Sequence, residues 1–261
     1  MTVRTYNNYL KIDELLSLQQ PVSEGPEHDE MLFIVIHQVY ELWFKQILWE
    51  FDWLRGALEA NERPRTMATL KRILTILKTL VGQIDVLETM TPVDFSSFRS
   101  RLDSASGFQS VQFREVELVL GHRREGQLDH VPAGGPERAR LETRLRERTV
   151  YDSFLRFLAA NGHPVPAEVL DRDVTQAPAE DQRVRAILVG IYRRDPALRE
   201  TCERLVDLDE GIQEWRYRHV KMVQRTIGTK RGTGGSAGAE YLRNTLFQPL
   251  FPDLWAIRTE L

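Results

Sequence analysis

Cysteine is almost absent from this chain, which has only Cys202 among its 261 residues. One cysteine excludes an intrachain disulfide and a thiolate metal cluster, so any metal must be held by His, Asp or Glu, or within a cofactor. The sequence also lacks a run of the ~18 apolar residues that span a bilayer. Its start, MTVRTYNNYLKIDE, has no apolar signal-peptide region. We therefore expect a cytoplasmic protein without a membrane partner.

A strong charge of one sign is lacking too, since 35 basic residues face 38 acidic ones and the net charge is -3. This balance predicts no nucleic-acid partner. The stretch GTKRGTGGSAG, residues 228–238, is rich in glycine like a phosphate-binding loop. It lacks the Lys-Ser/Thr ending of a Walker loop and the preceding strand of a dinucleotide fingerprint. We therefore do not interpret it as a nucleotide site.

Alternating strand patterns are scarce, whereas apolar residues recur at helical spacing along most of the chain. This periodicity predicts helices over residues 29–54, 66–89, the stretch that ends near Gly121, 137–160, 180–194 and 196–227. No internal repeat or clean linker interrupts them, which favours a single all-α domain over residues 1–261. Residues 122–136, HRREGQLDHVPAGGP, are polar and rich in glycine and proline. They predict an exposed loop.

Two of the six histidines lie in apolar surroundings. His37 follows Phe33 by one helical turn, and His219 continues a stripe that contains Trp215. The other four occupy polar stretches and are predicted to be solvated: His28, His122, His130 and His163. A buried imidazole either bonds a backbone carbonyl or binds a metal. No HExxH or two-His-one-carboxylate spacing is present, whereas a haem needs only one protein ligand on its proximal side. The residues alone leave these alternatives open.

Three long segments resemble the tryptophan 2,3-dioxygenase family: TYNNYLKIDELLSLQQPVSEGPEHDEMLFIVIHQVYELWFKQILWEF, DFSSFRSRLDSASGFQSVQFREVELVLG and WRYRHVKMVQRTIGTKRGTGGSAGAEYLRNTLFQPLFPDLWAIRT. The similarity covers nearly the whole chain, and residues 122–180 are the least diagnostic. It implies a helical bundle with long helices around one b-type haem per subunit, ferrous when active, and a homotetramer. It also implies that both atoms of O2 are inserted across the indole C2–C3 bond of L-tryptophan, giving N-formylkynurenine in the kynurenine pathway of tryptophan catabolism.

The resemblance assigns roles to the two histidines. His219, in WRYRHVKM, matches the axial ligand of the haem iron, and Trp215 lies beside it in the haem-binding motif. His37, in MLFIVIHQVYELW, matches the distal histidine that meets the indole N–H. It positions the indole as a neutral acceptor, and whether it also removes the proton stays open.

The same comparison gives the contacts of the amino-acid substrate. Phe33 matches the aromatic residue that packs against the indole. Arg99 matches the residue that pairs with the substrate carboxylate, which a guanidinium can hold through two parallel hydrogen bonds, while Arg101 is predicted to be solvated. Phe95 stands where some family members have Tyr, so one carboxylate contact is lost. Thr233 matches the threonine that holds the ammonium and carboxylate ends, on a mobile substrate lid formed by residues 228–238.

The remaining matches concern the edge of the haem and a second subunit. Ser106 and Gly107 match the loop around the haem edge. Tyr6 and Tyr9, in the N-terminal segment 1–20, match residues that reach a neighbouring subunit's pocket. Two other functions stay open at this point. One is a haem monooxygenase or peroxygenase of the same superfamily acting on a modified indole or related aromatic substrate in secondary metabolism. The other is a helical binding protein that uses RTIGTKRG on an anionic partner.

Overall fold

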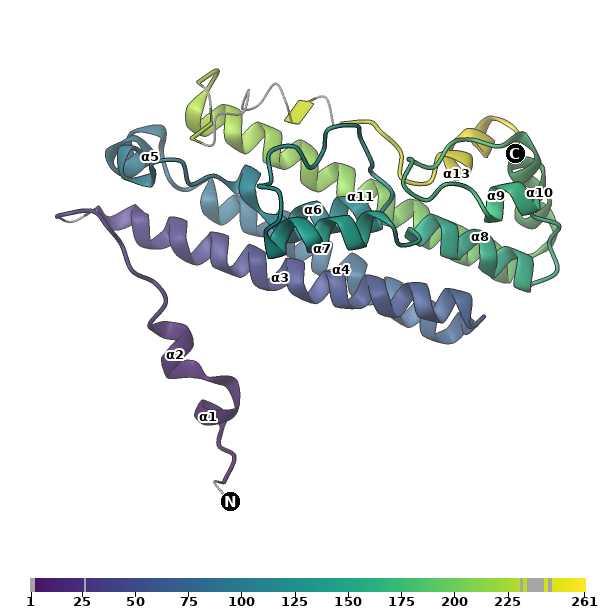
Figure 1. The fold of residues 1–261 in the computed structure, drawn as a ribbon, viewed down its shortest axis with the longest axis horizontal. Helices are drawn as coiled ribbons and strands as arrows, with labels where there is room; N and C mark the ends of the chain where they lie inside the picture. Colours follow the sequence, from purple (N-terminus) through teal and green to yellow (C-terminus); the bar gives the residue numbers. More distant parts are fainter. Residues whose placement is uncertain (1–2, 26, 231, 234–241, 244–245) are drawn as a thin grey trace.

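The computed structural model describes residues 3–25, 27–230, 232–233, 242–243 and 246–261. The regular secondary structure of these residues is helical, without any strand (Figure 1). The α-helices are α1 (Tyr6–Leu10), α2 (Ile12–Leu16), α3 (His28–Glu59), α4 (Arg63–Leu87), α5 (Pro92–Arg99), α6 (Val111–Val119), α7 (Pro136–Leu145), α8 (Val150–Ala160), α9 (Ala167–Leu170), α10 (Gln182–Arg194), α11 (Pro196–Ile227) and α13 (Pro252–Ala256). Short 3-10 helices are η1 (Ser100–Leu102), η2 (Gly107–Gln109) and η3 (Ile257–Thr259).

Two helices of 32 residues each, α3 and α11, run along the molecule and both pack against α4. The sequence sets both ends of α11. At its start the Asp195 side chain accepts hydrogen bonds from the backbone N–H groups of Ala197 and Leu198, and Pro196 takes the first helical position. At its end Gly228 has a φ of 61°, which glycine adopts without steric cost. The predicted helix 196–227 is therefore confirmed.

One continuous hydrophobic core joins α3, α4, α6, α8, α10, α11 and α13. Its fully buried side chains include Phe51 of α3, Leu70 of α4, Phe154 of α8 and Leu205 of α11. Because a single core connects helices from most of the chain, the predicted all-α single domain is confirmed. None of the helices in the described part of the chain is both long and apolar enough to cross a membrane.

The helical pattern predicted over residues 137–160 is broken into α7 and α8. The break lies at Thr149, whose hydroxyl accepts the Asp152 N–H at 3.2 Å while the Asp152 carboxylate accepts the Thr149 N–H at 2.7 Å. This reciprocal pair satisfies the first N–H groups of α8, and both residues are buried. The T-x-x-D spacing is visible in the sequence and could have placed the boundary.

The predicted loop over residues 122–136 is present, but it is only partly exposed. The segment before α7 is irregular, but Leu128 and Val131 are buried in a small cluster with Leu118 of α6. Arg123 is buried as well, and its guanidinium donates to backbone carbonyls of α6 and of the chain around α7. His122 is also buried, so its predicted solvation was wrong. Turn-forming composition shows where a helix stops, but it does not show whether the turn is covered.

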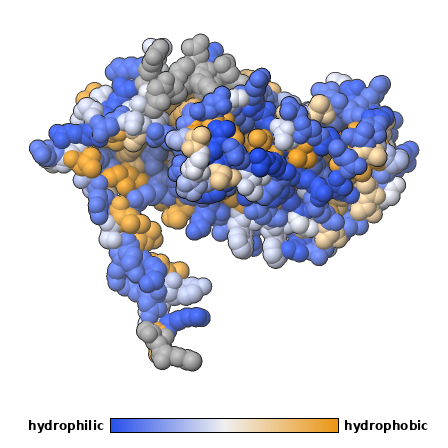
Figure 2. Space-filling view, in the orientation of Figure 1, coloured by the Kyte–Doolittle hydropathy of each residue, from blue (hydrophilic) through white to orange (hydrophobic). Residues whose placement is uncertain are grey.

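The N-terminal segment projects from the body as an arm that carries α1 and α2 (Figures 1 and 2). Its apolar side chains are exposed: Val3, Tyr6, Tyr9, Leu10, Leu15, Leu16, Leu18 and Val22. The arm meets α3 at Gln38, whose side chain donates to the Leu18 carbonyl and accepts from Gln19. A segment that exposes this much apolar surface is typical of a binding element.

Candidate active site

A cavity of about 250 Å³ lies between α3 and α11, closed at its sides by α4, α5, α6 and the loop 105–110. One buried water needs only ~10–15 Å³ by this kind of measure, so the cavity admits a large organic molecule. All the site residues predicted from the sequence border it except Tyr6 and Tyr9. The structure thus brings together motifs that are up to about 200 positions apart in the chain.

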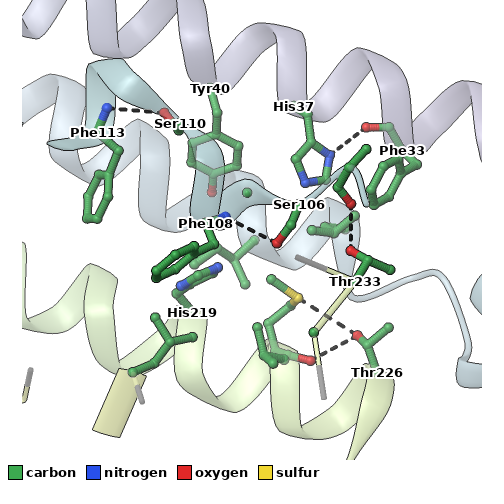
Figure 3. A pocket seen from close by; sticks show the side chains of 18 of the residues that line it. Phe33, His37, Tyr40, Ser106, Phe108, Ser110, Phe113, His219, Thr226 and Thr233 are labelled. Carbon is green, nitrogen blue, oxygen red and sulfur yellow. Dashed lines mark hydrogen bonds between the residues drawn. The ribbon is translucent and has the colours of Figure 1, made fainter. Parts of the chain in front are cut away.

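His37 projects from α3 into this cavity (Figure 3). Its Nδ1 lies 2.7 Å from the Phe33 carbonyl oxygen. A carbonyl only accepts, so we assign the proton to Nδ1, which leaves Nε2 of the neutral ring as an acceptor. Burial lowers the pKa of His37, against smaller opposing effects of the Phe33 carbonyl and Glu41. The ring is therefore neutral near pH 7 and can accept one hydrogen bond.

His219 projects into the same cavity from α11, on the opposite side (Figure 3). Trp215, one turn earlier, stacks on it with ring centroids 5.1 Å apart and planes at 10°. Burial, assisted by the nearby His37, lowers the pKa of His219 to about 4. Within the described part of the chain neither ring nitrogen has a hydrogen-bond partner. The side chain is thus a neutral, oriented imidazole with a lone pair available to a ligand.

Aromatic rings form the wall beside His37. Phe33 lies 4.1 Å from the His37 ring and 5.8 and 5.6 Å from Phe95 and Phe98, measured between ring centroids. Phe95 and Phe98 are buried, so α5 is fixed against α3 by this cluster. Such a wall suits a flat apolar ring and excludes bulk water.

Polar groups meet the aromatic wall at one end of the cavity. Arg99, the last residue of α5, borders the cavity, whereas Arg101 is exposed as predicted. The Thr233 hydroxyl donates to the Ala105 carbonyl oxygen at 2.5 Å, which ties residue 233 to the loop 105–110 (Figure 3). Of the predicted lid 228–238, residues 231 and 234–238 lie outside the described residues. A guanidinium and a hydroxyl beside an apolar wall can hold the polar end of an amphipathic molecule.

The loop 105–110 forms a side of the cavity. The Ser106 hydroxyl accepts the Phe108 N–H at 3.3 Å and thereby starts η2. A Cβ at Gly107 would meet no protein atom within 4 Å. The backbone at Gly107 therefore has open space beside it, and a bound group could approach it closely.

Tyr6 and Tyr9 stay outside this cavity. Both are exposed on the projecting arm, with 75% and 69% of their surface accessible. Within one chain the arm does not reach the site, so their predicted contribution requires a second copy.

The sequence analysis missed a group of charged residues that border the cavity. Arg114 and Glu117 of α6 and Arg216 of α11 are each buried. Charged residues on a helix are usually solvated, so the residue types at these three positions did not indicate that they would be buried. The one available indication was spacing, since Arg216 precedes His219 by three residues on the same helix.

His122 touches this charged group and allows a test of the electrostatics. Burial and the adjacent Arg216 lower the pKa of His122 to about 3. Below pH 6.5 the unfolded chain binds a proton on this histidine and the folded protein does not. Stability therefore falls as the pH falls, by about 1 kcal/mol per pH unit. We expect His122→Gln to reduce the pH dependence of the unfolding free energy by this amount between pH 6.5 and 5.5, measured by urea denaturation of the haem-free protein.

Equal slopes for the wild type and His122→Gln would show that His122 is not held neutral in the folded protein.

No three His, Cys, Asp or Glu side chains come together as a metal site in the part of the chain that the structure describes. A metal at His219 would therefore need a cofactor to supply its other ligands. The cavity has the features of a haem site: an apolar interior, one imidazole with a lone pair available, and arginines at its margin. Fold and site together define a helical protein with a large aromatic-lined pocket between two facing histidines.

Comparison with known proteins assigns this arrangement to a family. A family model described as tryptophan 2,3-dioxygenase matches residues 1–133 and 179–261. The tryptophan 2,3-dioxygenase of Herpetosiphon aurantiacus is 60% identical over 257 residues, 98% of each chain. That of Anaeromyxobacter sp. strain K is 57% identical over 262 residues, 98% of this chain and 96% of its own. The chain belongs to the tryptophan 2,3-dioxygenase family, and the resemblance predicted from its motifs is confirmed.

Proposed function

We propose that this protein is a haem-dependent dioxygenase that cleaves the indole C2–C3 bond of L-tryptophan with O2 to give N-formylkynurenine. Membership of the family supports the reaction. The observation that carries the proposal in the structure is the pairing of His37 and His219 across a cavity that also holds Arg99.

His219 would hold the haem iron through its free ring nitrogen, with Trp215 keeping the imidazole plane in position. When bound, the haem supplies the redox-active iron that activates O2. The chain supplies the binding and orientation of the substrate and the exclusion of water.

The other cavity residues define an orientation for tryptophan. His37 Nε2 accepts the indole N–H, and Phe33 packs against the indole ring. Arg99 pairs with the carboxylate at the other end of the substrate. Thr233 already donates its hydroxyl proton to the Ala105 carbonyl, so its oxygen is left to accept from the ammonium group. Phe95 cannot add the hydroxyl contact that a tyrosine would give.

A lid over residues 228–238 is part of the proposal. Its first residue, Gly228, ends α11 with a positive φ. The Thr233 hydroxyl is hydrogen-bonded to the Ala105 carbonyl oxygen, which belongs to the loop 105–110. Closing this segment over the substrate would exclude water from the cavity.

We also propose a homotetramer in which the segment 1–20 completes a neighbouring pocket with Tyr6 and Tyr9. The exposed apolar arm supports an assembly, and so does an exposed stripe on α3: Met31, Val35, Leu42, Trp49 and Trp53. These five residues are spaced by four or seven positions, so they share one helical face. A face of this kind is normally covered in an oligomer.

Deleting residues 1–20 is expected to lower kcat/KM for tryptophan by about tenfold or more, because burying one aromatic side chain contributes about 1.5–3 kcal/mol. The arm-deleted chain and a full-length Arg99→Ala chain should each show this kind of strongly reduced activity alone. Co-expressed with two affinity tags and purified as a mixed oligomer, they should regain activity, because the arm of one chain enters the intact pocket of the other. Activity is measured as formation of N-formylkynurenine.

An arm-deleted chain that also carries Arg99→Ala serves as the control partner, and it should give no recovery. Full activity of the arm-deleted protein, or no recovery in the mixed oligomer, would contradict the exchange of arms.

The reaction itself is tested with isotopically labelled O2. Reduced, haem-loaded protein is mixed with L-tryptophan, and the product is identified by mass spectrometry. Label at both new oxygen atoms of N-formylkynurenine is expected. A hydroxylated product with a single labelled atom would show a monooxygenase, and a folded protein that binds no haem would refute the proposal.

A further inference from the structure

Glu30, in the first turn of α3, is a buried carboxylate that the proposed reaction does not use. It is 2% exposed, although charged side chains are rarely buried unless they are paired. Its two oxygens accept backbone N–H groups of the arm, one from Val22 at 2.7 Å and the other from Ser23 at 3.1 Å. Although burial opposes ionisation, the hydrogen bonds from the arm and the nearby Arg101 hold the pKa of Glu30 below its usual value. An ionised carboxylate thus joins the body of the protein to the base of the arm.

These hydrogen bonds are not the ordinary cap of a helix. Glu30 is the third residue of α3, and a glutamate at this position usually accepts the backbone N–H of the N-cap residue, here Glu27. The Glu27 N–H instead donates to the Gly25 carbonyl at 2.9 Å, and the Glu30 carboxylate turns to the arm. Hydrogen bonds of this charged type are about twice as strong as neutral ones. Glu30 therefore stabilises the position of the arm more than the start of its own helix.

A turn and a second contact fix the arm along the same helix. Gly25 has a φ of 111°, which glycine adopts without steric cost, and it lies where the chain turns from the arm into α3. About two turns beyond Glu30, the Gln38 side chain donates to the Leu18 carbonyl at 3.2 Å and accepts from Gln19 at 2.5 Å. The base of the arm is therefore held at two points on α3. Figure 1 shows the arm leaving the body from the end at which α3 begins.

The helix that holds the arm also carries the surface proposed to meet a second copy. The exposed apolar stripe of α3, from Met31 to Trp53, begins one residue after Glu30. In the proposed assembly this stripe fixes α3 relative to the second copy, and the contacts of Glu30 and Gln38 fix the arm relative to α3. An arm that is already oriented loses less conformational entropy when it enters a pocket, and its effective concentration there is higher.

We propose that Glu30 is a positioning residue for the active site of the neighbouring subunit, because it sets the direction in which the arm carries Tyr6 and Tyr9. This inference rests on the proposed function and on the proposed exchange of arms. Glu30 does not border the cavity of its own subunit. A substitution at Glu30 should therefore act on the pocket of another chain and not on its own.

The test uses Glu30→Gln, which keeps the shape of the side chain but removes its charge and one of its two acceptor oxygens. In the full-length protein, kcat/KM for tryptophan should fall about tenfold, the effect of losing one hydrogen bond to a charged group. Haem content should stay at the wild-type value. Glu24→Gln is the matched control, because Glu24 is exposed beside the same segment and should change neither quantity.

A mixed oligomer separates action on the neighbouring pocket from a local effect. It combines an arm-deleted chain, whose pocket is intact, with an Arg99→Ala chain, whose arm is intact. Glu30→Gln in the Arg99→Ala chain should lower the recovered activity about tenfold, because that chain supplies the arm. The same substitution in the arm-deleted chain should leave the recovered activity unchanged, because that chain supplies the pocket.

Hydrogen exchange gives a readout that is independent of catalysis. The N–H groups of Val22 and Ser23 should exchange about tenfold faster in Glu30→Gln than in the wild type, whereas Glu24→Gln should match the wild type. Equal loss of recovered activity from either placement of Glu30→Gln would overturn the inference, and so would unchanged exchange at both N–H groups.

Two further outcomes separate this inference from the proposals on which it rests. A mixed oligomer that recovers no activity even without Glu30→Gln would refute the exchange of arms and this inference with it. A wild-type protein that forms no N-formylkynurenine would instead refute the proposed function. The exchange rates of Val22 and Ser23 would still decide whether Glu30 holds the arm.

Discussion

Replacing His219 by glycine is expected to abolish stable haem binding and to lower tryptophan cleavage by on the order of 10³-fold or more, about 4 kcal/mol of transition-state stabilisation. His219 is the imidazole that α11 presents to the cavity, and no group of metal-binding side chains in the described residues could replace it. Trp215, parallel to the ring at 5.1 Å, would remain as one wall of the vacated space. Added imidazole should therefore fill this space and restore the Soret band and part of the activity.

The measurement is a haem titration of the variant with and without imidazole, together with the rate of N-formylkynurenine formation. His28→Ala is the control, because His28 is 96% exposed at the start of α3 and should change neither quantity. A His219→Gly protein that binds haem with the wild-type spectrum and without imidazole would show that another residue holds the iron. The proposed geometry of the site would then fail as a whole.

The parts of the fold that the sequence predicts well are those with local causes. The ends of α11 follow from Asp195, Pro196 and Gly228, which act on backbone groups within one turn. The second predicted helix was misplaced by only a few residues, because Pro64 lies inside the first turn of α4 and not before it. The break at Thr149 was missed even though its cause is equally local. Capping pairs therefore need to be weighed together with hydrophobic periodicity.

Burial of polar residues was the part that the sequence could not predict. His122 and Arg123 follow a helix in a polar stretch, and only the packing of that stretch on α6 and α7 shows that they are inside. Arg114 and Arg216 are 102 positions apart, and both pair with Glu117. The cavity residues were found because long motifs resembled a family. The charged group beside them required the three-dimensional arrangement.

Replacing Arg99 by methionine is expected to lower kcat/KM for L-tryptophan by about 10²-fold, because a charge-assisted carboxylate contact contributes about 3 kcal/mol. Methionine keeps an unbranched apolar side chain at this position, and Phe95 and Phe98 remain in their cluster, so α5 should stay packed. Haem content should not change. Tryptamine lacks the carboxylate, so its slow turnover should be nearly the same in the wild type and in Arg99→Met. The measurement is steady-state kinetics with both substrates on haem-loaded protein.

Arg101→Met is the matched control, since Arg101 is exposed two residues further along and should leave both substrates unaffected. Arg99→Lys should recover only part of the loss, because an ammonium group cannot form the two parallel hydrogen bonds of a guanidinium. If Arg99→Met slowed tryptophan and tryptamine equally, Arg99 would act by holding α5 and not by binding the carboxylate.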